Sequence, residues 1–267
     1  MRNLAFVGGG MMAEAIIRGV VTKKLLPASV IAVGEPVPAR REALVSRYGV
    51  QAFAGNVDAV EGADVVVLAV KPQYADEAMA GLTGRLPSSA LVVSIMAGIT
   101  IERIARAVGH RSIVRVMPNT PAQYGEGMSA WTATAEVSEE QADDVRSLLS
   151  ALGRQVNVAS EKYIDMATAL SGSGPGFVLL FIEALVDAGV HLGFSRPIAE
   201  ELAIQTVLGT AVMARESGQH LAILRNAVTS PAGTTAAGLY ELENGRLRAV
   251  VSKAVAAAYA RCIELGK

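Results

Sequence analysis

The sequence predicts a doubly wound α/β domain of the Rossmann type followed by an all-helical domain. Three observations favour this division. Short β-branched runs alternate with helical patterns in the first part of the chain, the strand signal disappears near residue 160, and a glycine-rich turn directly follows the first strand. The length of 267 residues suits two ordinary domains. We therefore place one domain at residues 1–159 and the other at residues 160–267.

The α/β part alternates predicted strands with predicted helices. The strands carry runs of Val, Ile and Ala, and we place them at residues 3–8, 30–33, 64–70, 90–97, 112–117, 127–131 and 155–159. Apolar residues at helical spacing predict helices near residues 11–22, 37–48, 73–81, 100–108 and 138–152. Apolar strands separated by helices of this length imply a mostly parallel sheet that is covered on both faces.

The second part shows helical patterns only, near residues 161–169, 175–193, 197–216, 219–227, 235–242 and 246–265. Its most apolar run, residues 177–194, still carries Glu183, Asp187 and His191, which makes insertion into lipid costly. A helix that is apolar on most faces in a soluble protein needs cover from other protein. We therefore expect an oligomer and no membrane partner.

Glu183, Asp187 and His191 repeat every four residues and therefore lie on one face of the predicted helix. Such a triplet suits either a metal ion or a polar stripe at a subunit interface. The stripe is favoured, because His110 and His220 are isolated along the chain and no spacing is typical of a metal site. We predict no metal site.

The charge balance disfavours nucleic-acid and membrane partners, and the cysteine content and the N-terminus indicate the compartment of the cell. The chain has 24 Lys and Arg against 25 Asp and Glu, so we expect no basic surface for nucleic acid or for an anionic membrane. The one cysteine, Cys262, cannot form an intrachain disulfide, and the N-terminus lacks the pattern of a signal peptide. These features predict a cytoplasmic protein.

The turn after the first predicted strand, "FVGGGMMAEAI", places Gly8, Gly10 and Ala13 in the spacing G-x-G-x-x-A. The first glycine allows a tight turn, the second lets the backbone approach a pyrophosphate, and the small third residue lets the helix pack on the strand. The amides at the start of the helix then face the phosphates. A tight turn without a ligand uses the same residues, but the place of this one at the first strand of an α/β domain favours dinucleotide binding.

Glu35 stands at the end of the second predicted strand, where an acidic side chain accepts hydrogen bonds from the hydroxyls of the adenosine ribose. Its charge would repel the 2′-phosphate of NADP, so Glu35 leans toward NADH. Arg40 and Arg41 open the next helix and could neutralise a phosphate if Glu35 turned away. The alternative is that both arginines form a solvated helix face. The sequence therefore leaves the choice between NAD and NADP open.

Further strand ends carry turn residues that suit a ligand. They are Asn56, "AVKP" at residues 69–72, Ala97 with Gly98, and "MPNTP" at residues 117–121. Ligands of doubly wound sheets bind at the carboxyl ends of the strands. A single Pro or Gly there only ends a strand, but four such turns are more than termination needs.

A loop rich in hydroxyl groups, "AVTSPAGTTAAGLYELE" at residues 227–243, interrupts the helical part. Its hydroxyl groups crowd around a proline and a glycine: Thr229, Ser230, Thr234 and Thr235 with Pro231 and Gly233. A threonine that caps the next helix would need only one hydroxyl. In a separate motif, "LSGSGPGF" at residues 170–177, Ser173 is placed to cap a helix with Pro175 near its first turn, and capping alone explains that motif.

Five motifs together resemble the pyrroline-5-carboxylate reductase family: "VGGGMM", "LAVKP", "MPNTP", "LSGSGP" and "VTSPAGTTAAGLYELE". They occur in the right order and spacing over nearly the whole chain, and the last is highly specific. The resemblance implies NAD(P)H-dependent reduction of 1-pyrroline-5-carboxylate to L-proline, the last step of proline biosynthesis. It implies a dinucleotide-binding domain, a helical dimerisation and substrate domain, and a homodimer through the helical domain, from which larger assemblies such as a decamer are often built.

The resemblance also assigns residues. It implies that Ser230, Gly233, Thr234 and Thr235 bind the substrate, with the amides around Gly233 and Thr234 on its carboxylate, and that Thr235 and Ser230 are the catalytic residues. The cofactor contacts it implies are Val7, Gly8, Gly9, Gly10, Met11, Met12, Asn56, Ala69, Val70, Lys71, Pro72, Ala97 and, as a weaker match, Glu161. The loop of one subunit is expected to complete the site of its partner.

This chain departs from the family at Glu35, where a small hydroxylated or amide residue is usual, so the phosphate contact of NADPH is in doubt. It also has Gly9 where Ala or Ser is commoner, which we expect to be harmless. A protonated cyclic imine is already electrophilic, so the site needs positioning and exclusion of water more than a strong acid. The Thr235 hydroxyl is a weak neutral donor for the ring nitrogen, and Lys71 is a second candidate proton source.

Two alternatives have different sequence signatures. A β-hydroxyacid dehydrogenase or related imine reductase would have a lysine followed four residues later by asparagine, whereas Lys162 is followed by Met166 and Lys253 by Ala257. A dinucleotide-binding regulatory protein without turnover would keep the same fold. Composition does not separate that second alternative from an enzyme.

Overall fold

The structure, a computed structural model, describes residues 1–266 and divides them into two compact units. One unit consists of residues 1–173 together with the chain from residue 258 onward, and the other is Gly174–Ala257. Our domain boundary between residues 159 and 160 remains a prediction.

Within the described residues, one sheet of eight strands forms the centre of the first unit. The strands are β1 (Leu4–Val7), β2 (Ile31–Gly34), β3 (Gln51–Phe53), β4 (Val65–Leu68), β5 (Leu91–Ser94), β6 (Ile113–Met117), β7 (Gly127–Ala133) and β8 (Gly153–Asn157). Their order is β3-β2-β1-β4-β5-β6-β7-β8, and only β6 and β7 pair antiparallel. The order of the first six strands is that of a doubly wound dinucleotide-binding fold, so the predicted fold class is confirmed.

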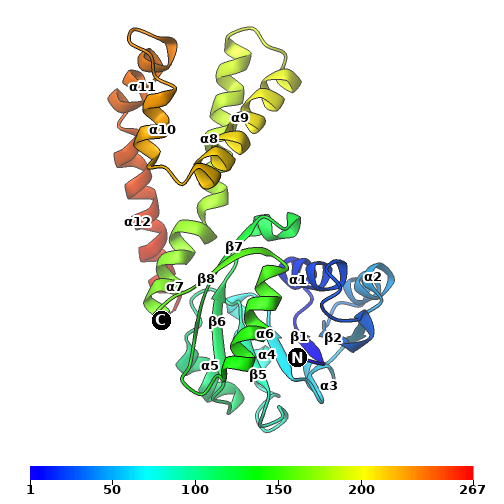
Figure 1. The fold of residues 1–267 in the computed structure, drawn as a ribbon. Coiled ribbons are helices and arrows are strands. Elements are labelled where there is room, and N and C mark those ends of the chain that lie inside the picture. The colour runs from blue at the N-terminus through cyan, green and yellow to red at the C-terminus, as the bar shows by residue number, and fades with distance from the viewer. Residues whose placement is uncertain (267) are drawn as a thin grey trace. The chain divides into compact units, whose positions relative to one another are not determined.

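Three helices cover one face of this sheet, as Figure 1 shows: α1 (Met11–Thr22), α2 (Pro38–Tyr48) and α6 (Glu139–Ser150). Their apolar sides and the residues of one face of the strands form a single core cluster, which includes Phe6, Ile17, Leu44, Trp131 and Leu148. Ser138 and Gln141 form a capping box at the start of α6, which satisfies backbone amides that a helix otherwise leaves unpaired.

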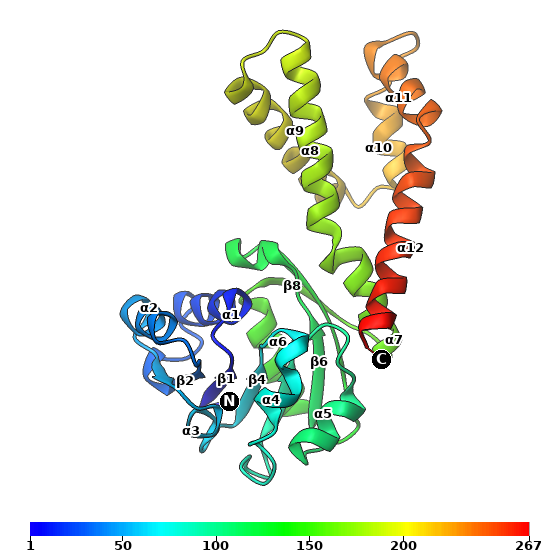
Figure 2. The same ribbon diagram turned by 180° about the vertical axis from the view of Figure 1, so that it is seen from behind.

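The opposite face is covered by α3 (Asn56–Val60), α4 (Ala75–Met79) and α5 (Ile101–Val108) (Figure 2). Its core cluster includes Val66, Met79, Leu82 and Ile104. The central strands β1, β4, β5 and β6 are therefore buried on both sides, which explains why the sequence of β4 is an unbroken apolar run. Short 3₁₀ turns add η1 (Ala28–Val30), η2 (Pro72–Tyr74) and η3 (Thr120–Tyr124).

The passage into the helical part differs from the prediction. α7 (Glu161–Ala167) runs into a π-helical turn, η4 (Thr168–Gly172), and α8 (Gly174–His191) follows after one residue. Ser173 has helical backbone angles and donates its hydroxyl to the carbonyl of Thr168 at 3.1 Å. The prediction that Ser173 caps a new helix is therefore wrong, because the chain continues through a wider turn instead of starting again.

The second unit contains α8, α9 (Arg196–Ser217), α10 (Leu221–Ala227), α11 (Thr234–Asn244) and the first part of α12 (Leu247–Leu265). Val186 of α8 packs on Ala199 and Ala203 of α9, and a Cβ on Gly189 would lie 3.1 Å from the Ala199 Cβ. Small residues thus let α8 and α9 approach closely. The predicted helices of this part are confirmed, with ends that differ by a few residues.

Many large apolar side chains of the second unit are exposed: Val178, Leu179, Leu180, Leu202, Ile204, Leu208, Val250 and Val251 are among them. One described helical stretch, Glu161–His191, is long and apolar enough to cross a membrane by length and composition alone, with a mean hydropathy of 1.6. The same test is passed by helices that pack against other protein. The predicted absence of a membrane partner remains a prediction.

Candidate dinucleotide and substrate site

The candidate site begins at the carboxyl edge of the parallel strands, where four strands end in register. Val7 pairs with both Gly34 and Leu68, and Leu68 pairs with Ser94. In doubly wound sheets this is the edge that binds ligands, at the point between β1 and β4 where the strand order reverses. The loops that start there carry most of the predicted cofactor contacts: residues 7–12, 35, 69–72 and 97.

The glycine turn has the shape that a bound pyrophosphate requires. Gly8 has φ of 98°, and a Cβ there would lie 2.8 Å from Val70 Cγ1, so only glycine fits. Gly10 is the N-cap of α1, and the nearest atom to a Cβ at this position would be the Ala69 carbonyl oxygen, 4.0 Å away. Met11 is 70% exposed. The amides at the start of α1 therefore face open space, which suits a phosphate group.

Glu35 is buried at the end of β2, with 9% of its surface exposed. Its Oε2 accepts a hydrogen bond from the Gly9 amide and its Oε1 accepts one from the Val37 amide, each at 3.0 Å. The carboxylate is therefore fixed against the glycine turn. A Cβ on Gly9 would lie 2.8 Å from Leu44 Cδ1 and 3.2 Å from Glu35 Cβ. An alanine at this position would therefore require the Leu44 side chain to shift. That Gly9 is harmless for cofactor binding stays a prediction.

Arg40 and Arg41 both bind acceptors of the protein itself. Arg40 donates from Nε to the Gly9 carbonyl at 2.6 Å and from Nη2 to Glu14 at 2.6 Å. Arg41 donates from Nη1 to the carbonyl of Glu35 at 2.7 Å. The interpretation of these residues as a solvated helix face is therefore wrong, because their guanidinium groups hold the glycine turn and the β2–α2 loop in place.

Glu14, in the first turn of α1, ties α1 to α2. Its carboxylate accepts hydrogen bonds from Arg40, Arg47 and the Tyr48 hydroxyl. Burial alone would raise the pKa of Glu14, but the hydrogen bonds from Arg40, Tyr48 and Arg47 and the charge of Arg40 outweigh it and hold this pKa below its usual value. Glu14 is therefore an ion-pair centre behind the glycine turn.

The remaining predicted cofactor contacts of the first unit lie on neighbouring loops. Asn56 is the first residue of α3, and its Nδ2 donates to the Ala78 carbonyl at 3.3 Å. Lys71 is exposed and precedes the η2 turn that begins at Pro72. Ala97 packs on a small cluster with Met117 and Ile164. Asn56, Lys71 and Ala97 thus lie in segments that follow three different strands, β3, β4 and β5.

Two predicted ligand residues are occupied by protein partners. Glu161 Oε1 accepts hydrogen bonds from the Ile101 amide at 2.8 Å and from Arg115 Nη1 at 2.9 Å. Asn119, in "MPNTP", binds the Met128 amide at 2.8 Å and the Ser171 carbonyl at 3.1 Å. Both side chains therefore hold loops together, whatever ligand they also meet.

The hydroxyl-rich loop is a tight turn in the second unit. The Gly233 amide donates to the Ser230 carbonyl at 3.0 Å, and Ala232 between them has φ of 57°. A Cβ on Gly233 would collide with Ser230 Oγ. Gly233 is the N-cap of α11 without a side-chain cap, so Thr234 and Thr235 are its first two residues. The alternative that a threonine caps this helix is therefore wrong.

This arrangement leaves polar groups available for a ligand. The side chains of Ser230, Thr234 and Thr235 are exposed, and the first amides of any α-helix have no partner within the helix. The N-terminus of α11 also carries a partial positive charge. A small carboxylate suits such a group of amides and hydroxyls.

Two further observations concern a hollow away from this site and the metal-binding side chains. A hollow of about 140 Å³ lies at the amino ends of β1 and β3, lined by Asn3, Ser29, Gln51 and Asp58 among others. That is the edge of the sheet opposite to the glycine turn. Among residues 1–266, no group of three or more His, Cys, Asp or Glu side chains is arranged to hold a metal ion.

Comparisons with known proteins match both the α/β part and the helical part of the chain. A family model described as pyrroline-5-carboxylate reductase dimerisation matches residues 161–265, and one described as NADP oxidoreductase, coenzyme F420-dependent, matches residues 3–98. A pyrroline-5-carboxylate reductase from Synechocystis sp. is 44% identical over 99% of this chain and 98% of its own length. The chain belongs to the pyrroline-5-carboxylate reductase family.

Other pyrroline-5-carboxylate reductases match over the full length. The enzyme of Escherichia coli is 36% identical over 98% of this chain and 96% of its own. The structure from Coxiella burnetii has a TM-score of 0.93 at 38% identity and covers 100% and 99% of the two chains. The structure from Plasmodium falciparum, with NADP bound, has a TM-score of 0.90 at 32% identity and covers 100% and 98%.

Proposed function

We propose that this protein reduces 1-pyrroline-5-carboxylate to L-proline with a reduced nicotinamide dinucleotide. The observation that carries this proposal is the coexistence, in one member of the pyrroline-5-carboxylate reductase family, of an open glycine turn at α1 and a hydroxyl-rich turn at the start of α11. The reaction needs both, because the hydride donor and the carboxylate-bearing imine are separate molecules.

The cofactor half suits a dinucleotide through its backbone. The open space at Gly10 and the amides that begin α1 would hold the pyrophosphate, and Glu35 would hold the adenosine ribose. The loop with Ala97 and the loop of residues 69–72 would flank the nicotinamide. When bound, the reduced nicotinamide supplies the hydride.

We propose NADH as the preferred donor. Glu35 is held by two amides, and the neighbouring arginines are bound to backbone carbonyls and to Glu14. A 2′-phosphate at this position would therefore meet a fixed carboxylate, and recruiting Arg40 would break the bonds that hold Gly9. A relative from Plasmodium falciparum has NADP bound, so the family itself does not decide the preference.

The substrate half suits a small anionic ring. The amides of Thr234 and Thr235 at the start of α11 would bind the substrate carboxylate, and the Thr235 hydroxyl would lie near the ring nitrogen. Ser230 would close the other side of the turn. These residues position the imine and keep it from water, which is the main requirement when the imine carbon is already electrophilic.

We further propose that the site is completed between two subunits. The match of residues 161–265 to a dimerisation model and the exposed apolar side chains of α8, α9 and α12 support a homodimer formed by the helical part. The division of function would follow residues 1–159 and 160–267, since the dimerisation match begins at residue 161. A decamer built from dimers, a cytoplasmic location and the absence of membrane or nucleic-acid partners remain parts of this proposal.

The test is an assay of the purified protein with 1-pyrroline-5-carboxylate and each reduced dinucleotide, followed by the absorbance of the nicotinamide. The proposal expects oxidation that depends on the imine, with a higher kcat/KM for NADH than for NADPH. Tight binding of a dinucleotide without oxidation would instead favour a regulatory protein. Turnover of a β-hydroxyacid but not of the imine would favour the other dehydrogenase class.

A further inference from the structure

Arg115 is a buried charge in the middle of an apolar strand. It lies in β6 between Val114 and Val116, and 1% of its side chain is exposed. Removing an ion from water is costly unless the protein supplies charged partners. A valine or leucine would fill this core position at a lower cost, so the guanidinium group needs another explanation.

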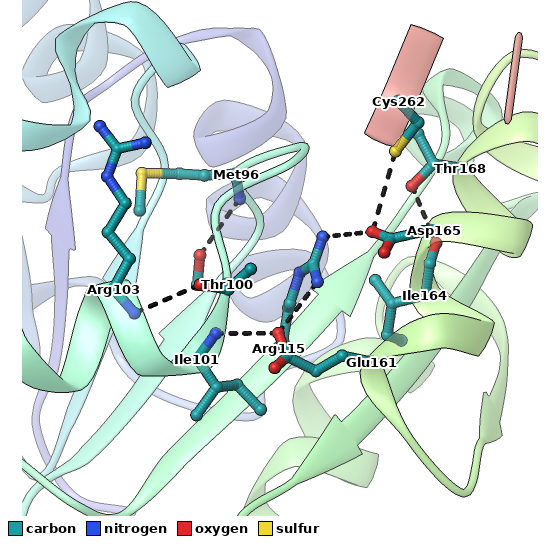
Figure 3. A network of polar contacts seen from close by, with 11 residues as sticks. Met96, Thr100, Ile101, Arg103, Arg115, Glu161, Ile164, Asp165, Thr168 and Cys262 are labelled. Carbon is teal, nitrogen blue, oxygen red and sulfur yellow. Dashed lines mark hydrogen bonds and ion pairs between the residues drawn. The ribbon is translucent and has the colours of Figure 1, made fainter. Parts of the chain in front are cut away.

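Its partners lie on one turn of α7, as Figure 3 shows. Arg115 donates from Nη1 to Glu161 Oε1 at 2.9 Å and from Nη2 to Asp165 Oδ1 at 2.7 Å. Glu161 and Asp165 are four residues apart on the same helix face, where two carboxylates repel each other. The planar guanidinium lies between them and fixes both orientations at once.

The contacts continue from Glu161 to the loop after β5. Glu161 Oε1 also accepts the Ile101 amide at 2.8 Å, and Ile101 is the first residue of α5. The segment between Ser94 and Ile101 contains Ala97, which packs on the small cluster that includes Ile164 of the same helix α7. The loop is therefore held at one end by the sheet and at the other by Glu161, with α7 beneath it.

The two carboxylates fix the position of the Arg115 guanidinium, although not every donor of this group is paired. Arg115 Nε is buried and has no hydrogen-bond partner among the described residues. An unpaired buried donor costs stability. Arg115 thus fixes the position of Glu161 at a cost to the free energy of folding. Such a cost is typical of a residue that serves a function besides stability.

We propose that Arg115 is a positioning residue for cofactor binding: it fixes the Glu161 carboxylate and, through the Ile101 amide, the loop that carries Ala97. All bonds to Glu161 among the described residues reach Oε1, and 31% of this side chain is exposed, so Oε2 is available to a ligand. The inference rests on the proposed function, because it assumes that a dinucleotide binds at this edge of the sheet.

The experiment measures the Kd for NADH of the purified protein by titration calorimetry, together with the midpoint of thermal unfolding. Arg115→Lys keeps the charge but loses the two-pronged geometry, and Glu161→Gln removes the carboxylate. We expect each to raise the Kd about tenfold. The double variant should bind NADH no more weakly than either single variant, because both changes act through the Glu161 carboxylate.

Asp165→Asn is the matched control. It removes the negative charge from the arm that has no contact with Ile101, and its amide oxygen can still accept the bond from Arg115. The Kd should therefore change less than about twofold even if the unfolding midpoint falls. A purely structural Arg115 would lower the midpoint in Arg115→Lys and leave the Kd unchanged, which would overturn the proposal. An equal loss of affinity in Asp165→Asn and Glu161→Gln would overturn it as well.

These binding measurements do not need turnover. If the wild-type protein binds NADH but does not reduce the imine, the proposed function fails and the role of Arg115 can still be decided. If Arg115→Lys does not fold, the comparison of Glu161→Gln with Asp165→Asn decides it.

Discussion

Glu35 binds two backbone amides with its two carboxylate oxygens, those of Gly9 and Val37. The same oxygens have further lone pairs, so the side chain can hold the glycine turn and still accept hydrogen bonds from ribose hydroxyls. Its effect on a 2′-phosphate is repulsive, and burial strengthens that repulsion because less water screens the charges.

Replacing Glu35 tests this assignment. Glu35→Ser should shift the ratio of kcat/KM values toward NADPH by about tenfold or more, because the fixed negative charge disappears beside two arginines. Glu35→Gln should shift it less, since the amide oxygen can still hold Gly9. Glu42→Gln removes an exposed charge from α2, the helix that carries both arginines, and should leave the ratio unchanged. An unaltered ratio in Glu35→Ser would remove Glu35 from cofactor selection.

Thr235 can be tested separately from the cofactor half. Thr235→Ala should lower kcat by about tenfold or more while the Kd for NADH stays nearly constant, because only the contact to the ring nitrogen is lost. Thr235→Ser restores the hydroxyl and should recover most of the activity. Steady-state kinetics with NADH binding as a second readout decides the question, and full activity of Thr235→Ala would exclude a catalytic role.

At the scale of elements, the glycine turn is held from behind by the α1–α2 pair. Glu14 of α1 binds Arg40 and Tyr48 of α2, and Arg40 also binds the Gly9 carbonyl. The position of the turn therefore depends on the packing of two helices as well as on its own glycines. This coupling makes Glu14 a point where stability depends on pH.

The pKa of Glu14 is lower in the folded protein than in the unfolded chain. The stability it contributes is therefore present at neutral pH and is lost as the pH falls through the folded pKa. Glu14→Gln should destabilise the protein by about 1 to 3 kcal/mol at pH 7, and the difference from the wild type should shrink below about pH 4.

Urea unfolding at several pH values measures this effect. Glu102→Gln is a suitable control, because Glu102 forms an exposed pair with Arg106 and should contribute less than about 1 kcal/mol. A Glu14→Gln variant with an unchanged midpoint at pH 7 would contradict the assignment.

The sequence predicts most helices and strands of the structure but misses several short elements. The long strands and helices follow from periodicity, and the candidate site follows from turns at strand ends. β3 and α3 were missed, because three and five residues are too short to show a period. The π-helical turn before Ser173 was missed because its residues look like a cap.

The cluster around Arg115 was missed for a different reason. Its signal is one arginine inside the apolar run "SIVRVM", and the partners that explain it lie 46 and 50 residues away in the sequence. Local patterns do not identify such partners. The locked position of Glu35 is a similar case, since the sequence indicates its place but not its bonds to Gly9 and Val37.

At the scale of the whole molecule, the two halves of the site lie in different parts of the chain. The glycine turn belongs to the first unit, and the loop of residues 230–235 belongs to the second. The exposed apolar residues of the second unit and its match to a dimerisation family support assembly through that part. The proposed site then combines the cofactor half of one subunit with the loop of its partner.

Mixed dimers test this combination. Gly10→Glu should abolish cofactor binding by placing a carboxylate where the pyrophosphate binds, and Thr235→Ala should disable the loop. If the two subunits share sites, unfolding and refolding the two variants together should restore about a quarter of the wild-type activity, because half of the dimers are mixed and each has one intact site of two. If each subunit builds its own site, the mixture should gain no activity.

The most direct measurement is a crystal structure of the protein with L-proline and NAD⁺ bound. We expect the proline carboxylate on the amides at the start of α11, its ring nitrogen near the Thr235 hydroxyl, and its ring facing a nicotinamide beside Ala97. Proline bound far from residues 230–235 would contradict it.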